Sequence, residues 1–275
     1  MSEIREITQS LLGMMSRCPH QVYLRYVKGI IIPPGIAARR GSAVHSGAEY
    51  AHRIKMEKDI VAPLDEVSDA THDSFVKMIT EEGVFLTEEE QDNKNEVLNQ
   101  SLNEAISLAS TYHRHIVPTL QSIGIIEERL YADVGVGLPI SGKMDLVADD
   151  AIRDIKTAGK RWSEGDENKK LQPDMYRCLL IKNGLPDLPF KYNILTNLKN
   201  EPKNTGENVI YDLEFKACCD SRETIRTAET EKKLIARIQV VAKMLKDGNF
   251  PPADSEHWLC SPTWCGYFGS VCKYT

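Results

Sequence analysis

The pattern of apolar and polar positions changes character near residue 125, and this change separates helical from extended segments. Before it, the chain predicts helices that are interrupted by the proline pair of IIPPGI. After it, short apolar runs of strand length alternate with amphipathic stretches of helix length. The predicted helices are 3–30, 37–56, 65–115, 168–183 and 220–247, and the predicted strands are 125–134, 138–148, 151–157, 190–198 and 207–215.

This order of elements, with helices followed by strands, a helix, strands and a helix, predicts an α/β (α+β) fold. Its central mixed β-sheet should be flanked by helices. The 275 residues suffice for one large domain or a domain with a substantial insertion, and a hydrophobic content of 41% can fill a core.

Composition and charge indicate the cellular compartment of the protein and the kinds of partner that it can bind. No apolar run approaches the roughly 18 residues of a membrane span, and MSEIREITQS lacks the apolar stretch of a signal peptide. We therefore expect a cytoplasmic protein without a membrane partner, in which the seven cysteines need not form disulfides. The formal net charge of −6 argues weakly against a nucleic-acid partner, although basic residues gathered in one cleft could still bind one.

A short hairpin within residues 141–160 carries charge where a sheet should be apolar. A two-residue turn at Asp149–Asp150 sets Asp145 opposite Asp154, with side chains about 5 Å apart. Strand alternation then returns Lys156 to the same face as Asp154. A divalent cation would relieve the repulsion between the two carboxylates. The alternative is a surface salt bridge on an exposed hairpin.

Two further pairs of polar residues are spaced four apart, as on one face of a helix. His45 offers an imidazole, a ready metal ligand, and Glu49 could support it or a bound water. Taken alone, the pair could equally be a partly buried histidine with a helical ion pair. Gln172 and Tyr176 form the second pair, and alone they fit an ordinary amphipathic helix.

Four short motifs follow one another along the chain: GSAVHSGAE, GKMDLV, RDIKT and QPDMY. In this order they resemble the PD-(D/E)XK nuclease superfamily, most closely its RecB-type branch, which includes CRISPR-associated and phage exonucleases. RCPHQVYLRY resembles a C-P-x-x-x-Y segment of that branch, so the resemblance spans roughly residues 8–275. The matching elements are Gly41 to His45, Gly142 to Asp145, Asp154 to Lys156, and Gln172 to Tyr176.

The resemblance implies a restriction-endonuclease-like core in a single nuclease domain of residues 1–275. A helical insertion at about 50–120 and a cysteine-rich C-terminal tail at 258–275 would complete this domain. The insertion has no counterpart among the motifs of the branch.

The resemblance also implies a metal site. Asp145 and Asp154 would hold Mg²⁺ or Mn²⁺, hard cations that prefer carboxylate oxygen. His45 would add a nitrogen ligand, which in this branch favours Mn²⁺, and the Ile155 carbonyl would complete the set. Such a cation activates water for in-line attack and neutralises charge on the scissile phosphate.

The remaining motif residues would act on the substrate and on the geometry of the site. In the family pattern, Lys156 positions the attacking water or stabilises the phosphorane. Gln172 and Tyr176 orient the site and contact the nucleic-acid backbone. Because phosphate contacts position a strand without reading its bases, the resemblance implies little sequence specificity.

One early cysteine and three late ones resemble the iron–sulfur site of some RecB-type nucleases. Cys18 would join Cys260, Cys265 and Cys272 around a [4Fe–4S] cluster, or around Zn²⁺ in a different geometry. The usual late cysteines are separated by two and five residues, whereas here the gaps hold four and six. Free cysteines in an ordered tail are the alternative.

Together these patterns predict a metal-dependent DNA exonuclease in recombination, repair, or phage or CRISPR DNA processing. Its partners would be single-stranded DNA or duplex ends, and a helicase, annealing or integrase protein. A catalytically inactive DNA-binding module of the same fold is a second hypothesis, and a metalloprotein unrelated to nucleic acid is a third. The complete set of Asp145, Asp154 and Lys156 argues against the second, because a degenerate member would be expected to lose one of them.

Overall fold

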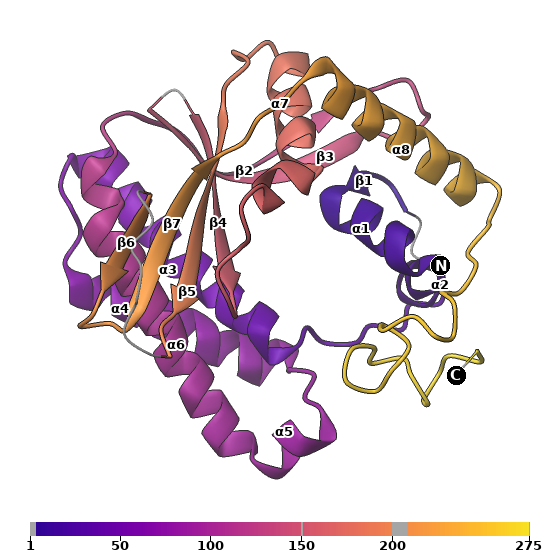
Figure 1. The fold of residues 1–275 in the computed structure, drawn as a ribbon, viewed down its shortest axis with the longest axis horizontal. Helices are drawn as coiled ribbons and strands as arrows, with labels where there is room; N and C mark the ends of the chain where they lie inside the picture. The colour runs from indigo at the N-terminus through magenta and orange to yellow at the C-terminus, as the bar shows by residue number, and fades with distance from the viewer. Residues whose placement is uncertain (1–3, 150, 200–207, 275) are drawn as a thin grey trace.

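The computed structural model describes residues 4–149, 151–199 and 208–274, which form a central sheet with helices on both faces (Figure 1). Within these residues the sheet has seven strands: six follow the order β1-β3-β4-β5-β7-β6, and β2 also pairs with β3. Because β1 runs parallel to β3 and β4 parallel to β5 while the other pairs are antiparallel, the sheet is mixed, as predicted. The strands are β1 (Ile7–Thr8), β2 (Ile123–Ala132), β3 (Ile140–Ala148), β4 (Ala151–Ala158), β5 (Phe190–Asn197), β6 (Val209–Asp212) and β7 (Ala217–Glu223).

Two groups of helices cover the two faces of the sheet (Figure 1). On one face, Leu11 of α1, Met175 of α7 and Leu234 of α8 belong to the same apolar core as Ile194 of β5. On the other face, α3, α4 and α6 pack against the sheet, and their core includes Leu195. Consecutive residues of β5 thus face opposite cores, which explains its continuous apolar run. The α-helices are α1 (Gln9–Arg17), α2 (Pro19–Val22), α3 (Ile36–Lys58), α4 (Leu64–Lys77), α5 (Glu88–Asp92), α6 (Lys94–His115), α7 (Gln172–Lys182) and α8 (Ala228–Lys246).

The hairpin of β3 and β4 has the predicted register. Ala148 pairs with Ala151, and Leu146 pairs with Arg153. Asp150, the second residue of the predicted turn, lies outside the described residues. The paired positions end at Leu146 and Arg153, and Asp145 and Asp154 are the next residues beyond them.

The predicted helix 3–30 is wrong near its start and at Cys18, where it is broken. Residues Ile7–Thr8 pair with β3 as a short strand, and Thr8 then caps α1 by accepting a hydrogen bond from Leu11 N. The helix ends at Cys18, whose backbone is extended because it precedes Pro19. Residue 3 lies outside the described residues.

The predicted helix 220–247 is wrong at its start. Residues Ala217–Glu223 form β7, which lies between β5 and β6, and α8 begins only at Ala228. The charges of β7 are paired, since Arg222 Nη2 lies 2.7 Å from the buried Asp220. The predicted strand 207–215 is shorter in the structure, as β6 covers 209–212 and residue 207 lies outside the described residues. None of the described helices is long and apolar enough to cross a membrane.

Candidate active site

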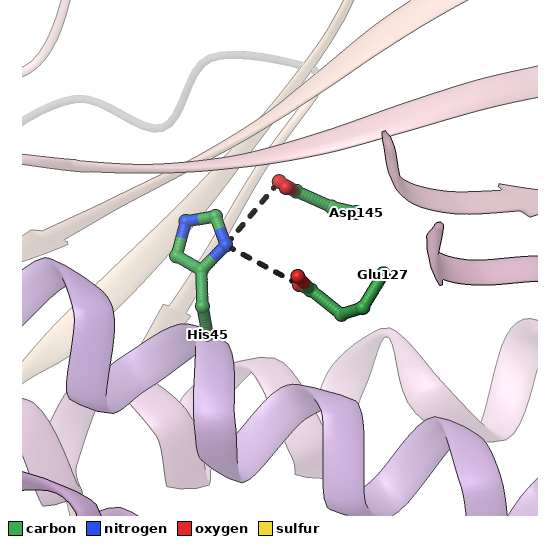
Figure 2. A group of neighbouring side chains, drawn as sticks. All are labelled: His45, Glu127 and Asp145. Carbon is green, nitrogen blue, oxygen red and sulfur yellow. Dashed lines mark ion pairs between the residues drawn. The ribbon is translucent and has the colours of Figure 1, made fainter. Parts of the chain in front are cut away.

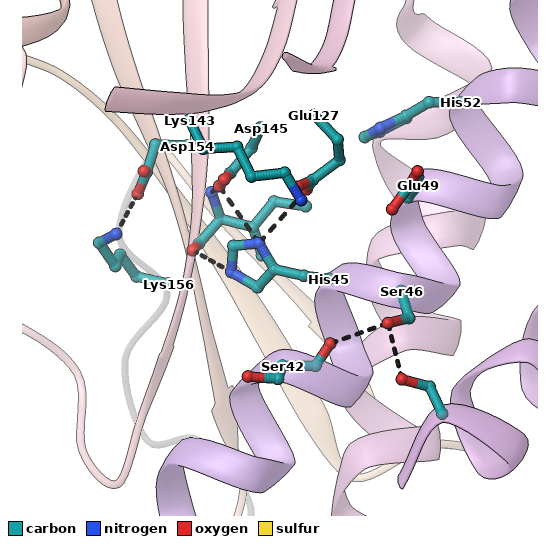
Figure 3. Close-up of polar contacts among 12 residues, drawn as sticks. Ser42, His45, Ser46, Glu49, His52, Glu127, Lys143, Asp145, Asp154 and Lys156 are labelled. Carbon is teal, nitrogen blue, oxygen red and sulfur yellow. Dashed lines mark hydrogen bonds and ion pairs between the residues drawn. The ribbon is translucent and has the colours of Figure 1, made fainter. Parts of the chain in front are cut away.

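The candidate site lies where α3 crosses the strands β2, β3 and β4 (Figure 3). A small residue brings the helix close to β4, because a Cβ added at Gly41 would lie only 3.0 Å from Thr157 Oγ1. About one turn later, His45 Nε2 lies 2.9 Å from the carbonyl oxygen of Ile155. The glycine of the first motif therefore allows the imidazole to reach the strand.

Asp145 connects this helix to both strands of the hairpin. Its Oδ2 accepts a hydrogen bond from Ile155 N at 2.9 Å and lies 3.4 Å from His45 Nδ1. Burial disfavours the charged imidazole, but the carboxylates of Asp145, Glu127 and Asp154 together outweigh burial and raise the pKa of His45 to about 10. Glu49 is not part of this pair, since its carboxylate lies 2.7 Å from Arg53 on the same helix.

Asp154 is the most deeply buried carboxylate of the site, with 1% of its surface exposed. Its Oδ1 accepts a hydrogen bond from Gln172 Nε2 at 2.5 Å. Its Oδ2 lies 2.6 Å from Lys156 Nζ but has no partner in hydrogen-bond geometry. Burial, only partly offset by Lys156, raises the pKa of Asp154 to about 6.

Lys156 keeps its charge in this setting. Burial alone would lower its pKa, but the carboxylates of Asp154 and Asp145 raise it. A third of the side chain remains exposed, so the ammonium is available to an incoming anion. The structure thus places Asp145, Asp154 and Lys156 near one another, although the two carboxylates have different partners.

The two motif residues of α7 are buried beneath the hairpin. Gln172 contacts Asp154, and the hydroxyl of Tyr176 donates to the carbonyl of Lys143 at 2.6 Å. Only 7% of Gln172 and 6% of Tyr176 is exposed. Such burial favours a role in fixing β3 and β4 over direct contact with a nucleic-acid backbone.

Gly142 is the position that lets Tyr176 lie against β3. A Cβ at this position would lie 2.6 Å from the Tyr176 ring and 2.9 Å from a methyl group of Leu179. Real Cβ atoms do not approach other atoms so closely. Packing of β3 against α7 therefore explains why the motif GKMDLV begins with a glycine.

We expect Gly142→Ala to destabilise the protein by roughly 1–3 kcal/mol, because the added methyl group overpacks the contact with Tyr176. Urea unfolding measures the change. Gly124→Ala is the matched control on β2, since its Cβ would meet nothing nearer than 3.8 Å. Equal stability of both variants would contradict this account of the motif glycine.

Glu127 is a site residue that the sequence did not predict (Figure 2). It lies on β2 with its side chain 10% exposed, and its Oε1 is 3.8 Å from His45 Nδ1. Its other oxygen, Oε2, lies 2.5 Å from Lys143 Nζ. Among the described residues, His45, Glu127 and Asp145 form the group whose potential ligand atoms all lie within 4.8 Å of one another.

Comparison with known proteins identifies this arrangement. The model of the PD-(D/E)XK nuclease superfamily matches residues 6–273. The chain belongs to this superfamily. A search of curated proteins found no match. Among solved structures, a protein from Eubacterium rectale described as "Putative exonuclease" is 13% identical, with a TM-score of 0.55 over 93% of this chain and 87% of that chain. At this identity the likeness shows the fold that the two proteins share.

PD-(D/E)XK nucleases use divalent metals, and the donors of this site suit one. An imidazole nitrogen and carboxylate oxygens converge within a few ångströms, and hard divalent cations prefer such oxygen-rich sets. The buried Asp154 Oδ2, which lacks a hydrogen bond, is a further oxygen with unused capacity. The backbone carbonyl of Ile155 lies beside His45 and could complete the set.

The four cysteines at the ends of this PD-(D/E)XK nuclease line one small cavity of about 20 Å³. The C-terminal segment lies beside the N-terminal helices there (Figure 1). Two N–H groups point at sulfur: Ala253 N donates to Cys18 Sγ at 3.4 Å, and Gln21 Nε2 donates to Cys265 Sγ at 3.2 Å. Cys260 and Cys272 complete the group.

Proposed function

We propose that this nuclease is a metal-dependent DNA exonuclease of the RecB-type branch, which hydrolyses phosphodiester bonds with little sequence specificity. The observation that carries the proposal is the arrangement of two acidic residues on adjacent strands. Asp145 of β3 lies beside His45, and Asp154 of β4 lies beside Lys156. The structural neighbour from Eubacterium rectale, described as "Putative exonuclease", adds support for action at DNA ends.

Each residue has a task in this proposal that follows from its contacts. His45, Asp145, Asp154 and the Ile155 carbonyl would hold Mg²⁺ or Mn²⁺. The bound cation would activate water and neutralise charge on the scissile phosphate. Lys156 carries a retained positive charge that can stabilise the anionic transition state.

The remaining contacts favour positioning over base recognition. Gln172 fixes the orientation of Asp154 through its amide, and Tyr176 fixes the backbone of β3. The exposed part of the site offers Lys156 and the half-exposed Lys143, which are suited to phosphate groups. Little sequence specificity follows from such a site.

We also propose that Cys18, Cys260, Cys265 and Cys272 hold a [4Fe–4S] cluster. Tetrahedral zinc, with Zn–S bonds of about 2.3 Å, would bring four sulfurs within roughly 4 Å of one another. In the described part of the chain, no three of these Sγ atoms all lie within 4.8 Å of one another. A four-iron cluster binds each thiolate through a different iron and so suits the wider spacing.

The biological setting belongs to the same proposal. A single unit of residues 1–275 would act in the cytoplasm on single-stranded DNA or duplex ends. Recombination, repair and phage or CRISPR DNA processing are the pathways that use such an activity, with a helicase, annealing or integrase protein as partner.

We expect the purified protein to degrade linear DNA with Mn²⁺ or Mg²⁺, to leave covalently closed circles intact, and to lose activity in EDTA. Lys156→Met should lower the rate by on the order of 10²–10³-fold, because it removes the cation that stabilises transition-state charge. Gel analysis of end-labelled single and double strands measures the rate. Lys160→Met is the control, since this exposed lysine follows the same strand.

Each contrary result selects another hypothesis. Binding of DNA without cleavage would identify an inactive DNA-binding module. Metal binding without any DNA binding would identify an unrelated metalloprotein. Cleavage of closed circles would indicate an endonuclease.

A further inference from the structure

Glu127 occupies a particular place in the sheet. On either side of it, Ile126 pairs with Leu146 and Glu128 pairs with Met144, so Glu127 lies beside Asp145 in the register. Three carboxylates therefore occupy adjoining positions on β2, β3 and β4. Like charges at such cross-strand positions destabilise a sheet unless a cation lies among them.

The backbone of Glu127 is itself unusual. Its φ of 51° lies in the left-handed region, which is rare for a residue other than glycine within a strand. A conformation of this kind is unfavourable for a residue with a Cβ and persists only where the surroundings hold it in place. Here it accompanies a side chain that is aimed inward, at His45 and Asp145 (Figure 2).

The imidazole of His45 has two different environments. Its Nε2 faces the Ile155 carbonyl, whereas its Nδ1 faces Asp145 at 3.4 Å and Glu127 at 3.8 Å. Asp154 is turned instead toward Gln172 and Lys156. The densest set of potential ligand atoms is thus on the Glu127 side of the site.

We propose that Glu127 is a direct ligand of the catalytic cation, together with His45 and Asp145. Once a cation displaces the proton of His45, one neutral imidazole and two carboxylates balance the charge of a divalent ion and give it a nitrogen and two hard oxygen donors. This inference rests on the proposed function, because it concerns the cation of the same site.

Lys143 competes with the cation for the carboxylate of Glu127. Its ammonium lies 2.5 Å from Glu127 Oε2, on the oxygen that does not face His45. Half of the Lys143 side chain is exposed, so it can leave Glu127 for water or a phosphate at little cost. The ammonium therefore neutralises Glu127 when no cation is bound, and metal binding releases Lys143 toward the substrate.

The test is Mn²⁺ binding by the full chain in the absence of DNA, measured by calorimetry and by the electron paramagnetic resonance of free Mn²⁺. Glu127→Gln keeps the shape of the side chain and should weaken binding by about 10-fold or more. Glu128→Gln removes the same charge from the exposed neighbour and should stay within about twofold. Equal Mn²⁺ affinity of the two variants would overturn the inference.

Lys143→Met provides a second, independent measurement, because it frees Glu127 from its competitor. It should tighten Mn²⁺ binding several-fold in the wild-type background and much less in the Glu127→Gln background. Equal tightening in both backgrounds would mean that Lys143 acts only through general electrostatics and that Glu127 is no ligand.

These results are separable from the proposed function. A wild-type protein that binds Mn²⁺ with dependence on Glu127 but never cleaves DNA would refute the nuclease activity and leave the ligand assignment standing. A protein that cleaves DNA while Glu127→Gln binds Mn²⁺ normally would refute only the ligand assignment.

Discussion

Replacing Asp154 with asparagine should abolish metal-dependent DNA cleavage and leave the metal-free protein at least as stable as the wild type. Activity falls because the buried carboxylate is lost both as a proposed metal ligand and as the partner of Lys156, and we expect a loss of on the order of 10²–10³-fold or more. Stability holds because asparagine can still accept the hydrogen bond from Gln172 and no longer buries a charge. The partly exposed Lys156 can turn from the new amide group toward water. Cleavage rates and thermal unfolding in EDTA measure the two effects.

The stability effect has a defined pH dependence. Burial raises the pKa of Asp154 from its ordinary value of 3.8 to about 6 in the folded protein. A raised carboxyl pKa favours the folded state most below pH 3.8, and this contribution is lost as the pH rises through 6. As the pH rises through this range, the free energy of unfolding of the variant should therefore increase relative to that of the wild type, by on the order of 1–3 kcal/mol in metal-free buffer. Saturating Mn²⁺ should narrow or reverse the difference, since the variant lacks one proposed ligand and gains less from binding than the wild type.

Asp73→Asn is the matched control, because it makes the same exchange on the exposed face of α4. It should change neither cleavage nor the pH dependence. Near-normal Mn²⁺-dependent cleavage by Asp154→Asn would refute the catalytic assignment, whatever happened to stability.

The hairpin shows how far local rules reach. A two-residue turn and the alternation of strands were enough to predict the register that brings Asp145 beside Asp154. The same rules could not predict the position of Glu127. Residues 133–139 connect β2 to β3, and a connection of this length does not determine the register in which the two strands pair. Once β2 and β3 are aligned, the position of Glu127 beside Asp145 follows directly.

The strands that were predicted as parts of helices form because they pair with strands that are distant in the sequence. Asp220 and Arg222 look like the polar face of a helix in the sequence, but in β7 they neutralise each other inside the sheet. The break at Cys18 needed only the rule for residues before proline, whereas the strand at Ile7–Thr8 depends on a parallel partner more than 130 residues away. Propensity alone cannot predict such pairings.

Replacing Cys260 with serine should have the largest effect on stability. If the four cysteines hold a cluster, the bond network joins residues more than 200 positions apart and constrains the unfolded chain. Its loss should cost several kcal/mol and lower the melting temperature by about 10 °C, with activity lost through unfolding. Differential scanning calorimetry of anaerobically purified protein measures the shift.

Cys260 is protonated when no metal is bound. Burial and then the neighbouring Cys18, Cys265 and Cys272 raise the pKa of its thiol, because a thiolate there would be poorly solvated and close to other sulfurs. A bound metal would displace this proton and balance the charge of the thiolates. The wild type should accordingly be brown, absorb at about 400 nm, and contain iron and sulfide.

Cys178→Ser is the control, because this cysteine packs in the core beside α8 and does not line the cavity. It should retain iron and colour, whereas Cys260→Ser should lose both. Colourless wild-type protein with stoichiometric zinc would keep the cross-link and change the metal. A cluster that fastens the tail to the N-terminal helices should make the wild type more stable than Cys260→Ser. Wild-type protein that binds neither metal and is only as stable as Cys260→Ser would therefore show that the cysteines meet only through packing.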